Sequence, residues 1–403
     1  MNKLVVVPID KLAVGMFVEA VHQQDGDLKI KTQGKVTTEN AISILKTKGI
    51  ISLIVDMERS DVARDTERDV DTDTNETERA EHVRGSVSLE DELTQASALY
   101  EEAKKLQKKL LHSIQAGLPV NFQPIKDVSE KFVNSLDRNP NALLCMIHLR
   151  QKDAYLLEHS LNVGILMGAF AQYLELDNDV VSELALAGML HDIGKIEIPD
   201  QILHKPGKLT DEEMDVMKGH VVKGLEVLKK MEGISKRLFH VVAQHHERLD
   251  GSGYPMGLND SDINIYGRMI AIVDGYDAMT ADRCYRKGMP PNQALKILLK
   301  CSETELDKAL VNKFIKYIGV HPVGSLVKLD SEKLSLVTEH NENAPLSPKV
   351  KTFFSFRSNH FVAPKDVNLA DKHCREKIAS AVRAEDIKIN YRKFFHEQIV
   401  LSK

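Results

Sequence analysis

The chain has 403 residues, 42% of them hydrophobic and 28% charged, a composition typical of a soluble globular protein. A chain of this length is too long for one ordinary hydrophobic core, so two or three domains are expected. Its formal net charge of -5 excludes a general nucleic-acid binder, because no basic excess is present to neutralise phosphates, and we expect no DNA partner. The four cysteines lack CxxC spacing and no stretch reaches the ~20 apolar residues of a membrane span, so a cytoplasmic protein without a thiolate zinc site is expected.

The first part of the chain predicts a small α/β domain over residues 1–56 with a regulatory role. Short strands are expected at 4–8, 16–19 and 50–56, with a helix at 38–48. Residues 57–92 are polar, acid-rich and nearly free of large apolar side chains. Such a segment cannot bury enough surface to offset its ordering entropy, so the sequence predicts an acidic flexible linker there.

Residues 93–119 predict a connecting helix, because apolar side chains recur at helical spacing along it. Two interpretations stay open. The helix either packs on its own domain, or it forms a dimer or carries a signal between a sensor part and a catalytic part. The sequence does not choose between them.

Amphipathic segments with short loops dominate residues 120–320 and predict an all-helical domain. Helices are expected at 127–136, 142–149, 155–174, 179–191, 211–228, 235–246, 265–279, 291–301 and 305–318. Residues 321–403 predict a short β-rich tail with strands at 327–329, 334–338 and 349–356, followed by a polar, weakly packed extension. The fold class is therefore mainly α, an all-helical bundle with a small α/β N-terminal domain and a β-rich C-terminal tail.

Imidazole and carboxylate side chains recur at the ends of apolar helical segments in the predicted bundle. Each one alone has an ordinary structural explanation, such as a hydrogen-bonded core histidine. An aspartate inside a run of core residues is costly, however, unless something neutralises it, and a bound cation does so directly. The candidate metal ligands are His159, His191, Asp192, His220, His245, His246 and Asp274.

Nitrogen ligands with hard oxygen ligands and no thiolate favour first-row divalent metals. The set exceeds the three or four ligands of one catalytic metal, which suggests two ions that share a carboxylate. Asp192 is the natural bridge, because its neighbour His191 would bind one ion while its own carboxylate reaches both. Such a pair suits phosphodiester hydrolysis, since it activates a bridging water and stabilises the developing phosphorane charge.

Other residues near these ligands are candidates for binding a phosphate or a nucleotide. Lys195 follows Asp192 by three residues and could meet a phosphate oxygen or the leaving group, or it could be a solvated lysine at a helix end. Gly194 is expected to end the preceding helix in a left-handed conformation. Arg283, Tyr285 and Arg286 could bind a nucleotide, or they could form an ordinary basic loop.

The stretches that carry these residues resemble the HD-GYP family of cyclic di-GMP phosphodiesterases. The matching stretches are HSLNVG at 159–164, HDIGKIEIPDQIL at 191–203, GH at 219–220, HHERLDGSGYP at 245–255 and IVDGYDAMTADRCYRKGM at 272–289. The resemblance implies an all-helical fold, a metal centre that often contains iron or manganese, and cleavage of cyclic di-GMP to linear pGpG and sometimes GMP by a metal-bridged hydroxide. Zinc, nickel, cobalt and magnesium are the alternative metals.

Carried over by position, the resemblance assigns the seven candidate ligands to the metals, Lys195 to catalysis and phosphate contact, and Arg283 and Arg286 to substrate binding. Some members hold a third metal with a glutamate four positions before the first ligand histidine, where this chain has Tyr155. Glu158 points elsewhere on a helix and cannot substitute, so a binuclear centre is predicted. Cys284 stands where the family often has proline, which is expected to loosen the basic loop slightly.

The resemblance extends to the regions on either side of the bundle. Residues 1–140 are similar to an uncharacterised domain that often precedes HD-GYP domains, and the segment after His321 is similar to a tail of the family. A homodimer and a diguanylate cyclase or other signalling protein are the candidate protein partners. Two alternatives to the phosphodiesterase stay open: a cyclic di-GMP-binding sensor or scaffold with little turnover, and a hydrolase of another cyclic dinucleotide.

Overall fold

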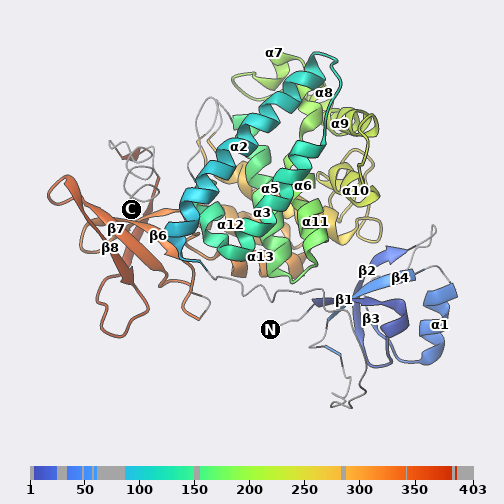
Figure 1. Cartoon of the computed structure of the whole chain (residues 1–403), viewed down its shortest axis with the longest axis horizontal. Helices are drawn as coiled ribbons and strands as arrows, with labels where there is room; N and C mark the ends of the chain where they lie inside the picture. The colour runs from blue at the N-terminus through green and yellow to red at the C-terminus, as the bar shows by residue number, and fades with distance from the viewer. Residues whose placement is uncertain are drawn as a thin grey trace, which may run out of the picture. The chain divides into compact units, whose positions relative to one another are not determined.

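The structure is a computed structural model that describes residues 4–24, 34–47, 50–56, 59–60, 87–148, 155–282, 287–341, 343–383 and 386–387. The chain divides into two compact units, residues 1–83 with 171–178 and residues 84–170 with 179–403, and each is described by itself (Figure 1). The mainly helical fold class predicted from the sequence is confirmed.

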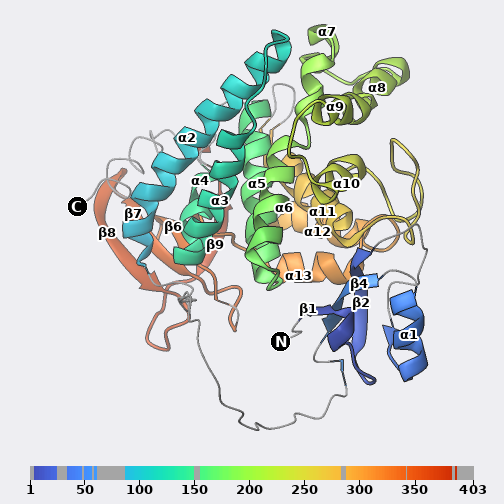
Figure 2. The same cartoon turned by 45° about the vertical axis from the view of Figure 1, so that its right-hand side comes forward.

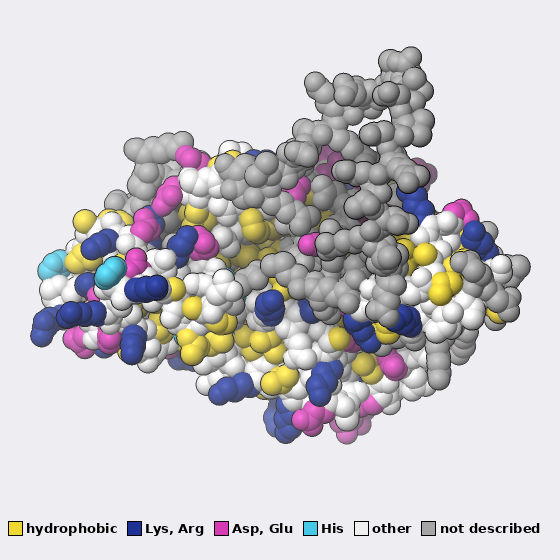
Figure 3. Space-filling view, turned by 90° about the horizontal axis from the view of Figure 1, so that it is seen from below, with side chains coloured by type: hydrophobic (Ala, Val, Ile, Leu, Met, Phe, Trp, Pro, Cys, Tyr) yellow, Lys and Arg dark blue, Asp and Glu magenta, His cyan; other side chains and the backbone are white. Residues whose placement is uncertain are grey.

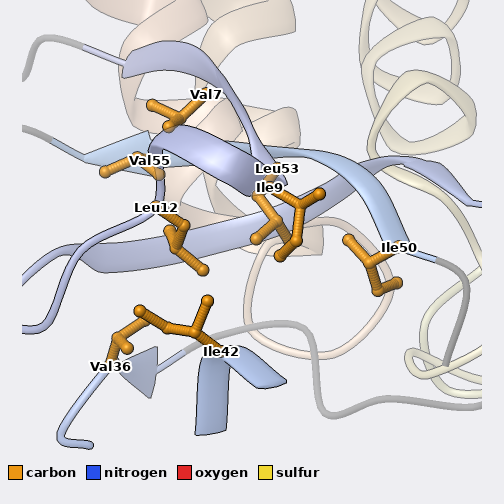
Figure 4. Packing of buried hydrophobic residues seen from close by; sticks show 8 residues of the cluster. All are labelled: Val7, Ile9, Leu12, Val36, Ile42, Ile50, Leu53 and Val55. Atoms are coloured by element: carbon orange, nitrogen blue, oxygen red, sulfur yellow. The ribbon is translucent and has the colours of Figure 1, made fainter. Parts of the chain in front are cut away.

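The N-terminal unit contains an antiparallel sheet and one helix. Its elements are β1 Leu4–Pro8, the 3-10 turn η1 Ile9–Lys11, β2 Phe17–Gln24, β3 Gly34–Lys35, α1 Glu39–Thr47 and β4 Ile50–Asp56. The strand order is β1-β4-β2-β3, so β4 pairs on both sides, and it is buried at every position except Ile51. Figure 4 shows Ile42 of α1 facing side chains of the sheet, among them Leu53, in one apolar cluster.

The second unit contains the helical bundle. Its helices are α2 Leu89–Gln115, α3 Gln123–Arg138, α4 Pro140–Met146, α5 Tyr155–Tyr173, α6 Asn178–Leu190, the 3-10 turn η3 Ile193–Glu197, α7 Asp200–Leu203, α8 Asp211–Lys218, α9 His220–Lys229, α10 Lys236–Gln244, α11 Ile265–Thr280, α12 Pro291–Cys301 and α13 Lys308–Ile318. Figure 2 shows α5 and α6 between α2 and α3 on one side and α10 on the other. Such central helices are apolar nearly all round, as α5, α6 and α11 are.

Helix α2 packs on its own unit, as the first of the two interpretations of this helix expected. Its buried face includes Leu93, Ala96 and Ala103, which are completely inaccessible to solvent, and it contacts α3 and α4. The helix begins at Leu89, inside the range expected as linker. Ser88 accepts a hydrogen bond from the Asp91 N–H, and acidic residues in the first turn favour a helix N-terminus. Residues 57–58 and 61–86 lie outside the described residues, so the flexible linker stays a prediction.

One expected helix, over residues 211–228, is two helices in the structure. Helix α8 ends at Lys218 and α9 begins at His220, with Gly219 between them at φ -59° and ψ -15°. These angles lie in the right-handed region that any residue adopts, so the bend does not depend on the conformational freedom of glycine. The bend places His220 in the first turn of a new helix. The short helix α7 was not expected.

The C-terminal part forms a larger sheet than the sequence predicted. Its strands are β5 Leu326–Leu329, β6 Lys333–Glu339, β7 Lys349–Ser355, β8 His360–Asn368 and β9 Ile378–Val382, antiparallel in the order β8-β7-β6-β5-β9. The strands β8 and β9 were not expected in what the sequence predicted as a polar, weakly packed extension. Both are edge strands with mostly solvent-exposed side chains, so their polar sequences did not suggest strands.

The C-terminal sheet lies at the N-terminal end of α2 (Figures 1 and 2). Lys351 of β7 donates to the Glu90 carboxylate of α2 at 2.6 Å. On the face drawn in Figure 3, described Lys and Arg side chains are interspersed with Asp and Glu over this sheet, and ion pairs such as Lys333–Glu376 at 3.0 Å join opposite charges. This face is therefore not a continuous basic surface.

Candidate metal centre

The first histidines of the site are brought together by a close crossing of α5 and α6. A Cβ atom added at Gly188 of α6 would lie 2.7 Å from the Gly164 Cα of α5, which is closer than real Cβ atoms come to other atoms. Only glycines allow the two backbones to approach this closely. The crossing places His159 of α5 beside His191, which follows the last residue of α6, with ring centroids 5.2 Å apart.

Asp192 lies at the centre of the candidate ligands. Its Oδ2 lies 3.5 Å from the His159 Nε2 and 3.4 Å from the His191 Nε2. Its Oδ1 lies 3.3 Å from the His220 Nε2 and 4.0 Å from the His245 Nε2. The two oxygens of one carboxylate therefore face two different pairs of imidazoles.

Two groups of potential metal ligands share this aspartate. One contains His159, His191 and Asp192, and the other contains Asp192, His220, His245 and His246; within each group the potential ligand atoms lie within 4.8 Å of one another. The second group is assembled from the start of α9 and the end of α10. It is compact, since the His220 and His245 Nε2 atoms are 3.3 Å apart.

Asp274 supplies a second carboxylate from the middle of α11. Its Oδ1 lies 3.1 Å from the His159 Nε2 and 3.7 Å from the His191 Nε2, while its Oδ2 lies 3.8 Å from the His246 Nδ1. The structure thus brings all seven sequence-predicted ligands into one place. Six of them are buried, and His246 is partly exposed.

Four of the five histidines are oriented by a hydrogen bond from their Nδ1 atom. The rings of His191, His220 and His245 donate to the backbone carbonyls of Gly188, Met217 and Val242, each three residues earlier, at 2.8, 2.8 and 2.6 Å. His159 donates to the Asp277 carboxylate at 2.7 Å. An acceptor at Nδ1 fixes the tautomer and leaves the Nε2 lone pair for a metal.

Asp277 is a candidate positioning residue that the sequence reasoning missed. It is completely buried on α11, three residues after Asp274, and it holds the ring of His159. The available signal was its spacing, because residues three apart lie on the same face of a helix. A second acid on the face of Asp274 points toward the same site.

Burial and charge act in opposite directions on the acids of the site. Burial alone would raise the pKa of Asp192, but electrostatic attraction to the neighbouring His191 ring and the Lys195 ammonium group holds this pKa well below its ordinary value. Burial would likewise raise the pKa of Asp274, and the contact with the His159 ring, together with the nearby His191 ring, lowers it well below the usual range. Both carboxylates are therefore ionised at neutral pH.

The histidines divide by their contacts. Burial lowers the pKa of His159, but hydrogen bonds to Asp274 and Asp277 outweigh it and raise the pKa to about 9. Burial lowers the pKa of His246 to about 3, and burial with the nearby imidazoles lowers the pKa of His245 well below its ordinary value. Neutral imidazoles are what a metal ion requires.

The residues present fit a bound pair of cations. The His191 Nε2 and the Asp192 Oδ1 are buried without a hydrogen-bond partner among the described residues. An unsatisfied buried acceptor costs about 1–3 kcal/mol. A cation held by each ligand group would satisfy one of these two atoms, and the set of nitrogen and carboxylate oxygen donors suits a first-row divalent metal.

The helix-ending role expected for Gly194 is wrong. Among the described residues, Gly194 is not one of the glycines with positive φ. It instead allows η3 to pack against α9, because an added Cβ would lie 2.0 Å from the His220 carbonyl oxygen and 2.3 Å from the Gly224 nitrogen. This contact fixes the position of His220 relative to Asp192.

Lys195 is close to the centre, and its ammonium group donates to the Asp192 Oδ2 at 2.5 Å. Its side chain is 20% exposed, so it lies at the border between the cluster and solvent.

Arg283, Cys284, Tyr285 and Arg286 lie outside the described residues, and their predicted roles stay predictions.

Glu158, which the sequence reasoning set aside as a metal ligand, points to α2. Its carboxylate, 2% exposed, accepts a hydrogen bond from the Lys104 ammonium group at 2.6 Å. The Gln107 side chain of α2 donates to the Met189 carbonyl of α6 at 3.0 Å. Helix α2 therefore contacts both helices that carry the first ligand group. The side chain of Tyr155 lies outside the described residues.

Comparison with known proteins places the chain in a family. Residues 143–310 match the model of the HD domain, and residues 4–125 match a domain of unknown function (DUF3391). The chain is similar to a cyclic di-GMP phosphodiesterase of Pseudomonas aeruginosa, with 38% identity over 74% of this chain and 72% of that protein. The chain therefore belongs to the HD-GYP family of HD-domain proteins.

Other relatives are similar over shorter parts of the chain. A cyclic di-GMP phosphodiesterase of Thermotoga maritima is 40% identical over 39% of this chain and 43% of its own length. A 3'3'-cGAMP-specific phosphodiesterase of Vibrio cholerae is 36% identical over 42% of this chain and 37% of its own length. The names of these relatives thus include two different cyclic dinucleotides. None of the described helices has the length and apolar character needed to cross a bilayer.

Proposed function

We propose that this protein is a metal-dependent phosphodiesterase that hydrolyses cyclic di-GMP to linear pGpG. The observation that carries the proposal is the position of Asp192, whose two carboxylate oxygens face two separate groups of histidines. A two-metal site bridged by a carboxylate suits the hydrolysis of a phosphodiester. The relatives that are named cyclic di-GMP phosphodiesterases support the choice of substrate.

The candidate ligands would hold two divalent ions, with Asp192 between them. His159, His191 and Asp274 would complete one position, and His220, His245 and His246 the other. When bound, such a pair supplies Lewis acidity toward the phosphodiester and lowers the pKa of a coordinated water. The donor set without thiolate suits a first-row divalent metal; among these we propose iron or manganese, which the resemblance to the HD-GYP family implies.

The chain's own residues orient the ligands and the substrate. The carboxylate of Asp277 and the backbone carbonyls hold four imidazoles with Nε2 directed to the ions. Lys195 carries a positive charge at the border of the cluster, where it can meet a phosphate oxygen of the substrate. Arg283, Tyr285 and Arg286 are proposed to grip phosphate and stack on a base.

The test is product chromatography with a matched pair of variants. Protein loaded anaerobically with iron or manganese should convert cyclic di-GMP to pGpG, and His245→Ala should not. His240→Ala is the control, because His240 lies exposed on α10, the helix that ends just before His245. Tight binding of cyclic di-GMP without a linear product would overturn the proposal in favour of a sensor.

A parallel incubation decides between the two cyclic dinucleotides. The similarity to a 3'3'-cGAMP-specific phosphodiesterase makes that dinucleotide the second candidate substrate. We expect a higher kcat/KM for cyclic di-GMP, and a reversed preference would replace the substrate while keeping the reaction. A homodimer and a cyclase partner stay predictions from the sequence.

A further inference from the structure

One ligand histidine is oriented differently from the other four. Within the described part of the chain, the ring of His246 makes no hydrogen bond, whereas the Nδ1 atoms of the other four each donate to an acceptor. The nearest carboxylate oxygen to its Nδ1, on Asp274, is 3.8 Å away, beyond hydrogen-bond distance. Something other than a hydrogen bond must orient this ring.

The neighbours of His246 are aromatic rings. The Tyr254 ring lies with its centroid 4.6 Å from that of His246, at an interplanar angle of 34°. The His245 ring lies 4.1 Å away at 42°. Aromatic rings at such separations attract one another and restrict each other's rotation. The face of Tyr254 therefore limits the orientations that the His246 imidazole can adopt.

The loop that carries Tyr254 is held against the double histidine by its own first residues. Glu247 is 2% exposed, and its carboxylate accepts from the N–H groups of Met256 at 2.7 Å and Leu258 at 2.9 Å. The N–H of Tyr254 donates to the His246 carbonyl at 3.1 Å. The loop thus folds back on the residues that precede it.

Gly253 is needed for this return. An added Cβ there would lie 2.4 Å from both the Glu247 Cα and the Arg248 nitrogen, which are backbone atoms that cannot rotate away. The glycine therefore serves the close approach of the loop to its own start. Its effect is to bring the Tyr254 ring onto His246.

We propose that Tyr254 is a positioning residue that sets the orientation of the His246 imidazole through the face of its ring and not through its hydroxyl. This inference rests on the proposed metal centre, in which His246 belongs to the group with Asp192, His220 and His245. Glu247 acts one step further away, since its carboxylate holds the loop that presents Tyr254. The group with His159 and His191 has no part in this contact.

The test measures binding at the two metal positions separately, by titrating metal-free protein with Mn²⁺ and counting bound ions by elemental analysis. Tyr254→Phe keeps the ring and should bind both ions like the unchanged protein. Tyr254→Leu fills similar space without an aromatic ring and should weaken one position about 10- to 100-fold, as is typical when the residue supporting a ligand is lost. The other position should keep its affinity.

Two further variants sharpen the result. Met256→Ala is the matched control, because Met256 is in the same loop and 57% exposed. It should leave both positions unchanged. Glu247→Gln removes one carboxylate oxygen from the two N–H groups and should weaken the same single position as Tyr254→Leu. The Mn²⁺ electron paramagnetic resonance spectrum should change for both weakened variants and not for Tyr254→Phe.

Each outcome decides the proposal. If Tyr254→Leu binds both ions like the unchanged protein, or if Tyr254→Phe loses as much as Tyr254→Leu, ring orientation by Tyr254 is wrong. Thermal unfolding of the metal-free variants identifies misfolding. If Tyr254→Leu misfolds, Glu247→Gln replaces it in the test, and the proposal is then wrong if Glu247→Gln binds both ions like the unchanged protein. Failure of the unchanged protein to bind two ions would instead refute the proposed metal centre itself.

Discussion

Two glycines on neighbouring helices should respond to the same substitution with opposite signs. Gly188 of α6 and Gly275 of α11 both lie inside helices within three residues of a candidate metal ligand. A Cβ at Gly188 would lie 2.7 Å from the Gly164 Cα and 2.8 Å from the Val163 carbonyl oxygen. A Cβ at Gly275 would meet only the Leu298 Cδ2, at an ordinary 3.7 Å.

The magnitudes follow from these distances. Gly188→Ala forces backbone against backbone, so α5 and α6 must separate, and overpacking of this kind costs about 1–3 kcal/mol. Gly275→Ala introduces no clash and removes the conformational freedom of a helical glycine, which should stabilise the protein by about 0.5–1 kcal/mol. Each kcal/mol corresponds to a Tm change of about 2–4 °C in a domain of this size.

Thermal and urea unfolding of the metal-free variants measure the difference. Gly188→Ala should unfold earlier than the unchanged protein and Gly275→Ala later. Gly188→Ala should also reduce turnover, since displacement of a catalytic group by about 1 Å can cost a hundredfold in rate. Equal stability of the two variants would refute the conclusion that a close helix crossing positions His159 and His191.

The remaining predictions concern the site itself. Asp192→Ala should abolish the binding of both ions by elemental analysis, and full metal content would refute its bridging role. The pKa of His159 is raised to about 9 in the ion-free protein, so a metal ion must displace a proton from this ring when it binds. The apparent affinity for Mn²⁺ in titrations should therefore rise with pH and level off above about pH 9. An affinity that falls over this range would contradict the assignment of His159 as a ligand. Asp277→Asn keeps the shape of the side chain beside the His159 Nδ1 but removes its charge, and should weaken metal binding about tenfold in the same titration. An unchanged affinity for Mn²⁺ would contradict the positioning role of Asp277. Arg283→Ala should raise KM for cyclic di-GMP about tenfold or more with both ions retained, and a loss of metal would contradict its role in substrate binding.

The sequence predicted the fold well where periodicity was strong. The apolar pattern of α12 gave its bounds, Pro291–Cys301, without error, and the continuous apolar run of β4 gave Ile50–Asp56. The sequence-based prediction failed where a helix or strand lacks a regular spacing of apolar residues. The acids after Ser88 looked like linker although they stabilise a helix start, and the exposed edge strand β8 carried too few apolar residues to be noticed.

The candidate site was predicted in composition but not in orientation. All seven ligands could be proposed, because histidines and acids among core residues need neutralisation. The sequence could not reveal that Asp277 holds His159 or that Tyr254 lies against His246, because these contacts join residues through the packing of different elements or through a folded loop. Their spacing along the chain carries little information about them.

The central claim is that one carboxylate, Asp192, joins two groups of histidines around a pair of cations. The most direct measurement is the number of tightly bound divalent ions per chain in protein purified without oxygen, by elemental analysis. We predict two ions per chain. A single ion, or none, under conditions in which the protein remains folded would contradict the account.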